Sequence, residues 1–148
     1  MIAIGSDHGG FPLKEEIRAY LDEQGIPYKD FGTYDDRSVN YAPFALKVSE
    51  AVASGEYEKG ILICGTGIGI SMAANKVKGI RAACCNDLYC ARMTRLHNDA
   101  NVLCMGGRVI GPGVAIDITD AFLHTYFEGG RHKDRIDQIQ KIENGEEL

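Results

Sequence analysis

Residues 60–76 read GILICGTGIGISMAANK, the sequence of a strand followed by a glycine-rich loop and a helix. The apolar run 61–63 is typical of a buried parallel strand. Glycines at every second position from Gly65 to Gly69 predict a tight loop, and residues 70–75 are compatible with the start of a helix. Such a turn points successive backbone N–H groups at one spot beside the positive end of the helix dipole. The stretch therefore predicts an anion-binding site at the end of this strand.

Cys64 is the residue at which this strand ends. A thiol beside a helix N-terminus can lose its proton near neutral pH, so the loop combines a base or nucleophile with an anion site. The alternative is a purely structural loop, because glycine also permits tight packing turns. The chain's other cysteines are interpreted as small apolar residues in strands or on a helix face. They stand at 84, 85, 90 and 104, and their spacing matches no zinc pattern.

Strand-like and helix-like segments alternate along the whole chain. Strands are expected at residues 2–5, 28–31, 60–64, 80–84 and 101–105. Between and after them, apolar residues recur with helical spacing, at Leu13, Ile17, Tyr20 and Leu21, at Phe44, Val48 and Val52, at Leu88, Ala91 and Leu96, at Ile118, Phe122 and Tyr126, and at Ile136, Ile139 and Ile142. This alternation predicts an α/β fold with a parallel sheet and helices on both faces, as one domain over residues 1–148.

The composition is that of a soluble globular protein, with 45% hydrophobic and 25% charged residues among 148. A net charge of −5 argues against a general nucleic-acid or membrane-surface binder. No apolar run is long enough to cross a bilayer. The first strand is not preceded by a basic segment of the signal-peptide kind, and five cysteines fit reduced thiols. We therefore expect a cytoplasmic protein.

Ligands of parallel α/β folds bind beyond the carboxyl ends of the strands, so the residues that follow the strands are the candidates. Asp7 and His8 follow the first strand, Arg108 follows the fifth, and His97 comes shortly before the fifth. Asp7 could instead cap the helix that begins near residue 11, and His97 could be a helix C-terminal residue that suits the dipole. Capping leaves His8 unexplained. We expect both histidines at the same edge of the sheet as Cys64.

A dinucleotide site is a poor match for the glycine-rich loop. Residues 65–69 read G-x-G-x-G rather than G-x-G-x-x-G, and they belong to the third strand–helix unit rather than the first. A dinucleotide site needs an acidic residue at the end of the next strand to bind the ribose, and this strand ends without one. Asp87 lies just beyond it, at a spacing poorly suited to a ribose contact. The chain has no Gly-Lys-Ser/Thr sequence, which excludes a nucleotide P-loop.

Arg131 and Arg135 lie four residues apart and share one face if this segment is helical. As a functional pair they would bind a phosphate or a carboxylate, whose geometry arginine matches well. The alternative is a solvated surface in which they pair with Glu128, Asp134 and Asp137. If they serve the same site as Cys64, the C-terminal helix must reach that site within the chain or from a second subunit.

Beyond single motifs, the chain resembles the type B ribose-5-phosphate isomerases of the wider ribose/galactose-phosphate isomerase group. The matching segments run in family order through nearly the whole chain, at residues 5–10, 40–41, 60–76, 79–82, 97–101, 106–108 and 128–132. The resemblance implies a Rossmann-like three-layer α/β/α fold, with a five-stranded sheet in the order 2-1-3-5-4. It also implies a homodimer or dimer of dimers with shared active sites, and interconversion of D-ribose 5-phosphate and D-ribulose 5-phosphate without metal or organic cofactor.

Catalytic roles follow from the same resemblance. Cys64 matches the base that moves a proton between C1 and C2. Some relatives place a glutamate later in the loop instead, and this chain has none there. His97 matches the residue that opens the furanose ring, and Asp7 helps to handle the hydroxyl protons. The anion hole corresponds to Thr66 and the loop amides of Gly65, Gly67 and Gly69.

Substrate-binding roles are implied at six further positions. Tyr41 and Asn98 match sugar-contacting residues. The phosphate-binding residues of the family correspond to His8, Arg108, Arg131 and Arg135. The resemblance implies that Arg131 and Arg135, on the C-terminal helix, bind the phosphate in the site of the partner subunit. Two alternatives remain open: an isomerase of allose 6-phosphate or galactose 6-phosphate, and a non-catalytic sugar-phosphate or nucleotide-binding domain.

Overall fold

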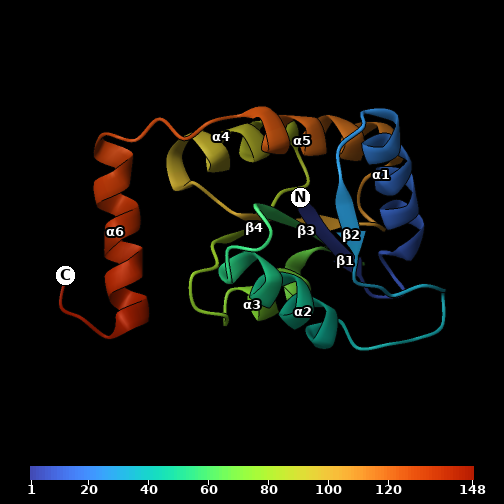
Figure 1. Cartoon of the computed structure of the whole chain (residues 1–148), viewed down its shortest axis with the longest axis horizontal. Helices are drawn as coiled ribbons and strands as arrows, with labels where there is room; N and C mark the ends of the chain where they lie inside the picture. The colour runs from blue at the N-terminus through green and yellow to red at the C-terminus, as the bar shows by residue number, and fades with distance from the viewer.

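The computed structural model describes residues 1–148 as a sheet of five strands with six helices (Figure 1). The strands are β1 (Ile2–Ser6), β2 (Tyr28–Asp30), β3 (Lys59–Cys64), β4 (Ala82–Cys84) and β5 (Val102–Gly106). The helices are α1 (Phe11–Glu23), α2 (Ala42–Ala53), α3 (Ile68–Ala74), α4 (Leu88–Asn98), α5 (Pro112–His124) and α6 (Arg131–Asn144). No helix is both long and apolar enough to span a membrane.

All strands of the sheet are parallel and lie in the order β2-β1-β3-β5-β4, which confirms the expected topology. In the centre of the sheet Cys64 of β3 is level with Gly106 of β5, and Ser6 of β1 is level with Ile63. Three chain segments therefore leave the sheet side by side at the edge where the strands end, called the carboxyl edge below. The opposite edge, where the strands begin, is called the amino edge.

The central strands alternate between two hydrophobic layers, as side chains on opposite faces of a strand must. Ile61 and Ile63 of β3 pack with α1, α4 and α5 on one face. Leu62 and Cys64 pack with α2 and α3 on the other face. Figure 1 shows these two helical layers above and below the sheet. Cys64 therefore ends its strand on the side of the α3 helix, the helix that follows its loop.

Two helix faces differ from the pattern expected from the sequence. Leu88 is 38% exposed, and Tyr126 lies beyond the end of α5 and is 82% exposed. In α4 the buried side instead includes Arg95, whose guanidinium lies over the Phe122 ring and donates to the Ala100 carbonyl at 2.6 Å. Arginine can be buried in this way because its stem is apolar while its head is hydrogen-bonded, here through Nε and Nη1.

The cysteines also differ in part from expectation. Cys85 and Cys104 are buried as apolar residues, whereas Cys84 and Cys90 are exposed. Cys84 ends the short strand at the edge of the sheet, and Cys90 lies in the first turn of α4. An edge strand and a helix N-terminus have fewer neighbours than the central strands, so the interpretation as packed residues holds for only two of the four.

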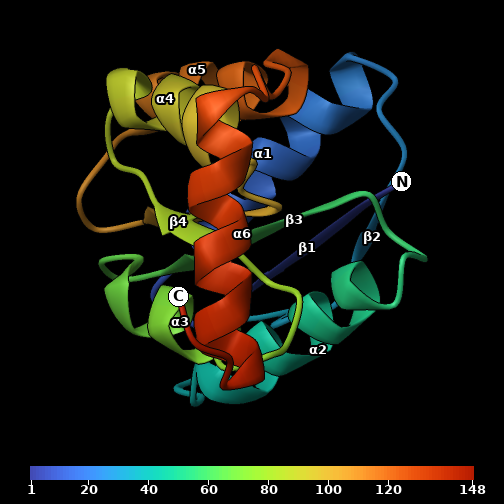
Figure 2. The same cartoon turned by 90° about the vertical axis from the view of Figure 1, so that its left-hand side faces the viewer.

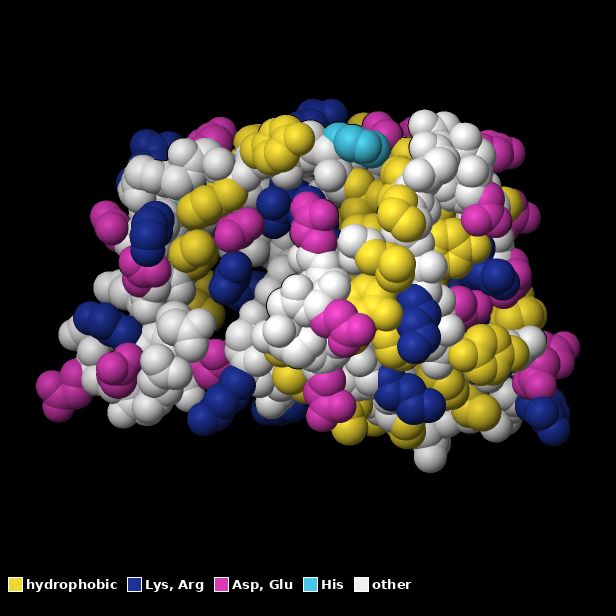
Figure 3. Space-filling view, in the orientation of Figure 1, with side chains coloured by type: hydrophobic (Ala, Val, Ile, Leu, Met, Phe, Trp, Pro, Cys, Tyr) yellow, Lys and Arg dark blue, Asp and Glu magenta, His cyan; other side chains and the backbone are white.

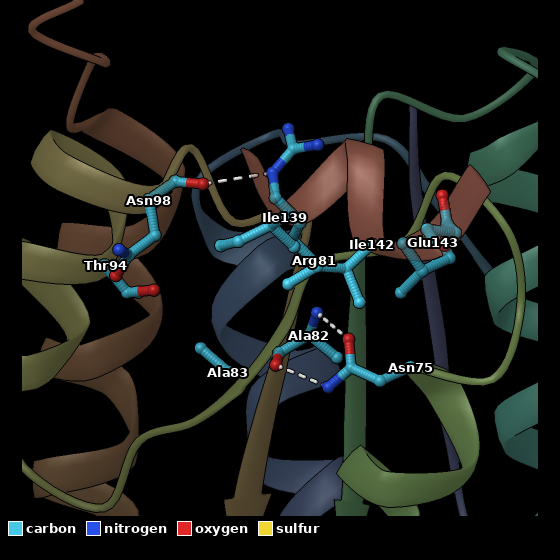
Figure 4. Close-up of a pocket in the computed structure, with 10 residues that line it drawn as sticks. Asn75, Arg81, Ala82, Ala83, Thr94, Asn98, Ile139, Ile142 and Glu143 are labelled. Atoms are coloured by element: carbon cyan, nitrogen blue, oxygen red, sulfur yellow. Dashed lines mark hydrogen bonds between the residues drawn. The ribbon is translucent and has the colours of Figure 1, made fainter. Parts of the chain in front are cut away.

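Helix α6 stands outside the two layers, beside the β4 edge of the sheet (Figures 1 and 2). A groove of about 520 Å³ separates it from β4 and α4 and is visible as a hollow in Figure 3. Figure 4 shows Ile139 and Ile142 of α6 on one side of this groove and Ala82 of β4 on the other. The Asn75 side-chain amide pairs with the backbone of Ala82 at 2.8 and 2.9 Å, which satisfies part of the open strand edge.

Candidate active site

Three loops meet at the carboxyl edge at distances that only glycine permits. A Cβ on Gly10 would collide with the Ile63 carbonyl, and one on Gly107 would lie 2.8 Å from the carbonyl oxygen of Gly9. Backbone hydrogen bonds join the loops as well, since the Gly107 N–H donates to the Cys64 carbonyl at 2.8 Å. The loops after β1, β3 and β5 therefore form one rigid rim around the end of β3.

Cys64 lies in the middle of this rim and is 5% exposed. Its Sγ accepts a hydrogen bond of 3.1 Å from the backbone N–H of Gly67. Gly67 has a φ of +82°, and a Cβ there would lie 2.8 Å from the Met105 carbonyl carbon, so a glycine is needed for this turn. The expected pairing of a sulfur with the loop amides is present in the structure.

Thr66 continues the same turn and is exposed at the tip of the loop. Its Oγ1 accepts from the Ile68 N–H at 3.1 Å, at the start of α3. Its carbonyl accepts from the Asn86 side chain at 3.1 Å, and Asn86 in turn accepts from the Gly106 N–H at 2.8 Å. Asn86 thus ties the loop after β3 to the end of β5. We did not identify it from the sequence, where its only signal is its place two residues beyond β4.

Asp7 and His8 follow β1 at this edge, as expected. The buried carboxylate of Asp7 accepts from the Gly10 N–H at 3.0 Å, which closes the turn before α1; the cap residue of the helix is Gly10 itself, so Asp7 is not the helix cap. His8 is half-buried, and its Nδ1 accepts from the Val39 N–H at 3.1 Å. This bond needs an unprotonated Nδ1, so the neutral ring carries its proton on Nε2.

Tyr41 and Arg108 lie at the two ends of the glycine-rich loop. A Cβ on Gly69 would be 2.7 Å from the Tyr41 ring and 2.9 Å from its hydroxyl oxygen. A Cβ on Gly65 would be 3.4 Å from a guanidinium nitrogen of Arg108. The structure therefore gathers Asp7, His8, Tyr41, Arg108 and the loop 64–69 at the carboxyl edge.

His97 and Asn98 lie elsewhere, and the expectation that both histidines share one edge is wrong. The Asn98 carbonyl accepts from the Arg81 Nε at 3.0 Å, and Arg81 directly precedes β4. The end of α4 is thus at the amino edge. A helix that connects two parallel strands must run back across the sheet, so its C-terminal end returns to the edge where the next strand begins.

Arg131 and Arg135 join His97 at that end of the molecule. They occupy the first turns of α6, and the neighbouring His132 ring stacks on His97 with 4.1 Å between centroids. Neither arginine forms an ion pair, because Asp137 is paired with Lys133 and Glu128 with His132. Both arginines are exposed, as the alternative of a solvated surface expects, and their guanidinium groups carry no ion pair that a ligand would have to displace.

The four other cysteines have thiols that are poor bases at neutral pH. Burial raises the pKa of Cys85 to about 12, and burial also raises the pKa of Cys104 and Cys84. The pKa of Cys90 is raised chiefly by its hydrogen bond to Asp87. Only Cys64 combines a position on the rim with a backbone donor aimed at its sulfur.

Comparisons with known proteins identify the family of this chain. A family model described as Ribose/Galactose Isomerase matches residues 2–139. The chain is similar to ribose-5-phosphate isomerase B of Escherichia coli, at 51% identity over 142 residues that cover 96% of this chain and 95% of that protein.

Two solved structures extend the likeness to the fold. That of Clostridium thermocellum ribose-5-phosphate isomerase B is 56% identical, with a TM-score of 0.96 and 97% of each chain covered. That of ribose-5-phosphate isomerase B from Mycoplasma genitalium, with bound ribulose 5-phosphate, is 43% identical. Its TM-score is 0.92, and the match covers 97% of this chain and 95% of that one.

The chain belongs to the ribose/galactose isomerase family. Two groups of side chains can thus be described for this family member, one at each edge of its sheet. The group at the carboxyl edge has the sulfur and the loop amides, and the group at the amino edge has His97 and the unpaired arginines. The only cluster of three metal-ligating side chains is at the amino edge, formed by His97, Glu128 and His132.

Proposed function

We propose that this chain is an aldose–ketose isomerase that interconverts D-ribose 5-phosphate and D-ribulose 5-phosphate without a cofactor, in active sites shared between two subunits. The proposal rests on the hydrogen bond that the Gly67 amide donates to the Cys64 sulfur at the end of β3. The chain that contains this contact is a member of the ribose/galactose isomerase family. A relative that is 43% identical binds ribulose 5-phosphate, which supports the substrate.

The reaction removes a weakly acidic C–H proton beside a carbonyl and builds negative charge on oxygen. It needs a base near the carbon and fixed donors where the charge of the enediolate develops. Cys64 is the proposed base, and the amides of residues 65–69 together with Thr66 are the proposed donors. An N–H donor binds a thiolate more strongly than a thiol, because a charge-assisted hydrogen bond is the stronger kind.

Ring opening and phosphate binding are assigned to the second group of residues. The substrate is mostly a closed ring, so an acid–base group must first break the hemiacetal, and imidazole titrates in a suitable range. We assign this step to His97, with Asp7 handling hydroxyl protons. The phosphate takes no part in bond changes, and its binding energy orients the sugar. Its proposed ligands are His8, Arg108, Arg131 and Arg135, with Tyr41 and Asn98 on the sugar.

A second subunit follows from the separation of the two groups. Cys64 and His97 lie at opposite edges of one sheet, so a single site that uses both must take them from different chains. Helix α6 stands outside the layers with Ile139 and Ile142 exposed, as a helix that contacts a partner would. We propose a homodimer in which the C-terminal helix of each chain reaches the site of the other.

The experiment is complementation between two inactive variants. Cys64→Ala and His97→Asn should each abolish formation of ribulose 5-phosphate from ribose 5-phosphate in a coupled assay. Refolding them together should restore about a quarter of the wild-type activity, because half of the dimers are mixed and each has one intact site. Mixed dimers that form, as differently tagged chains would reveal, but stay inactive would overturn the shared site.

Substrate range is measured separately. We expect a higher kcat/KM on ribose 5-phosphate than on allose 6-phosphate or galactose 6-phosphate, and the reverse order would favour a hexose phosphate isomerase. Exchange of solvent hydrogen into ribose 5-phosphate excludes a pure binding domain, which cannot catalyse it. All five cysteines are free in the structure, which fits the cytoplasmic location that we propose.

A further inference from the structure

Three side chains from two segments converge where α6 begins. His132 in the first turn of α6 is buried, and its Nε2 lies 3.3 Å from a carboxylate oxygen of Glu128. His97 reaches the same place from the end of α4 and stacks on the His132 ring at an interplanar angle of 13°. One ligand atom from each of the three lies within 4.8 Å of the others. Figure 2 shows the two helices side by side at this point.

The arrangement has the chemistry of a zinc site. Two histidines with one glutamate form a three-ligand set that leaves one coordination position open. In a tetrahedral site with bonds of about 2.0–2.1 Å, neighbouring ligand atoms are roughly 3.3–3.4 Å apart. The nitrogen of His132 and the oxygen of Glu128 are 3.3 Å apart, so these two ligands are already spaced for one ion. In the stacked arrangement the in-plane nitrogen lone pairs of the two rings do not converge on one point, so His97 must turn about its side-chain bonds to supply the third ligand.

An ion pair between a protonated His132 and Glu128 explains less of this geometry. The pair spans four residues at the start of a helix, and half of the Glu128 side chain is exposed, so it contributes little to stability. It also leaves out His97, whose ligand atom lies within 4.8 Å of those of the other two residues. A positive charge on both stacked rings would be repulsive, whereas one divalent ion attracts all three groups in their metal-binding forms.

We propose that His97, Glu128 and His132 bind a divalent transition ion of the zinc class, and that the bound ion inhibits the isomerase by occupying His97. The inhibition rests on the proposed role of His97 in ring opening, whereas the metal site stands on its own geometry. Imidazole ligands favour zinc and copper over magnesium or manganese. Because the imidazoles must be unprotonated to bind, zinc affinity falls as the pH is lowered through the titration range of histidine.

The binding test uses the intact chain, Zn²⁺ and a chromophoric chelator that competes for it. We expect one zinc per chain that Glu128→Gln weakens at least tenfold, because loss of a ligand costs more than the roughly 10–100-fold typical of outer-shell changes. His132→Gln serves as a second variant at the buried position. Cys84→Ser and Cys90→Ser are the matched controls, since both thiols are exposed and could bind zinc themselves. An affinity that Glu128→Gln and His132→Gln leave unchanged overturns the site.

Cobalt identifies the ligand atoms. Co²⁺ bound to nitrogen and oxygen should show only weak visible bands, whereas an ion held by Cys64 or Cys84 should add strong thiolate charge-transfer absorption in the near ultraviolet. Such absorption at one equivalent of Co²⁺ overturns the assignment of the site to His97, Glu128 and His132.

The activity test separates the two halves of the proposal. Zinc should inhibit the wild type, a chelator should restore it, and Glu128→Gln should stay active when zinc is added. Zinc that binds at this site without inhibiting overturns the regulatory half. A chain that binds zinc there but never isomerises ribose 5-phosphate refutes the proposed function and leaves the metal site intact.

Discussion

The backbone N–H of Gly67 donates a 3.1 Å hydrogen bond to the Sγ of Cys64, and this contact links the fold to the proposed chemistry. The sulfur belongs to the last residue of β3, and the amide belongs to the residue that precedes α3. Gly67 takes a left-handed conformation that turns the chain back over the strand end, with no room for a Cβ against Met105. The turn thus holds the sulfur against one backbone donor at the sheet edge.

Removing the sulfur should stop turnover. Cys64→Ala is expected to lower kcat at least about 100-fold, because general-base catalysis contributes roughly that much or more, while ribulose 5-phosphate binding stays within a few-fold. Steady-state kinetics and calorimetric titration measure the two effects. Cys84→Ser is the control, since its thiol lies near the loop but the partial burial of this otherwise exposed residue raises its pKa and makes it a poor base. Near-normal turnover by Cys64→Ala would exclude the thiol from the mechanism.

A methyl group at Gly67 should destabilise the fold more than one at Gly55. Both glycines have a φ of +82°, but a Cβ on Gly55 has no neighbour within 4 Å, whereas one on Gly67 lies 2.8 Å from the Met105 backbone. Gly55→Ala therefore isolates the conformational cost, about 1–2 kcal/mol. Gly67→Ala should exceed it by a further 1–3 kcal/mol, roughly the cost of overpacking. Urea unfolding measures both, and equal losses would contradict the close approach.

The arginines of α6 should act through substrate binding. Arg131→Ala and Arg135→Ala are each expected to raise KM by roughly 10- to 100-fold with a smaller effect on kcat, because a lost charged hydrogen bond costs about 1.5–3 kcal/mol. Lys133→Ala on the same helix is the control, since its charge is already paired with Asp137. A fall in kcat alone would show that the phosphate-binding assignment is wrong.

Lys14 should be among the most sensitive charged residues for stability. Its ammonium is fully buried and donates at 2.6–2.7 Å to both carboxylate oxygens of Asp30 and to the Thr33 carbonyl. Lys14→Met leaves that carboxylate with only the longer contact to Arg18, at 3.5 Å, as its ion pair and should cost roughly 3–5 kcal/mol in the free energy of unfolding. Lys133→Met removes an exposed ion pair and should cost less than about 1 kcal/mol. Similar losses from the two variants would contradict this reasoning.

Lys59 should make the protein more stable as the pH rises in the alkaline range. Burial lowers the pKa of its ammonium from the ordinary value of 10.5. The unfolded chain therefore binds more protons than the folded one between the lowered pKa and 10.5, and stability increases with pH across that window. Lys59→Met should remove this contribution. Unfolding midpoints of both proteins at several alkaline pH values measure it, and parallel curves would contradict the shift.

Sequence patterns predicted the positions of all five strands to within about two residues, because buried parallel strands are short apolar runs bounded by glycine and polar residues. They also predicted the loop after Cys64, since closely spaced glycines have few other uses. They did not predict the burial of Arg95 or Lys14, whose partners Ala100, Phe122 and Asp30 are chosen by how the helices pack. Asn86 was missed for the same reason.

For the candidate site, the residue types at the strand ends were sufficient to identify Asp7, His8 and Cys64, because the carboxyl ends of parallel strands share one edge. Only the tertiary structure decided that His97 lies at the opposite edge, beside Arg131 and Arg135. A local pattern specifies which residues face the same way within a strand or helix. The direction in which a connecting helix recrosses the sheet, and where α6 comes to rest, are properties of the packed chain.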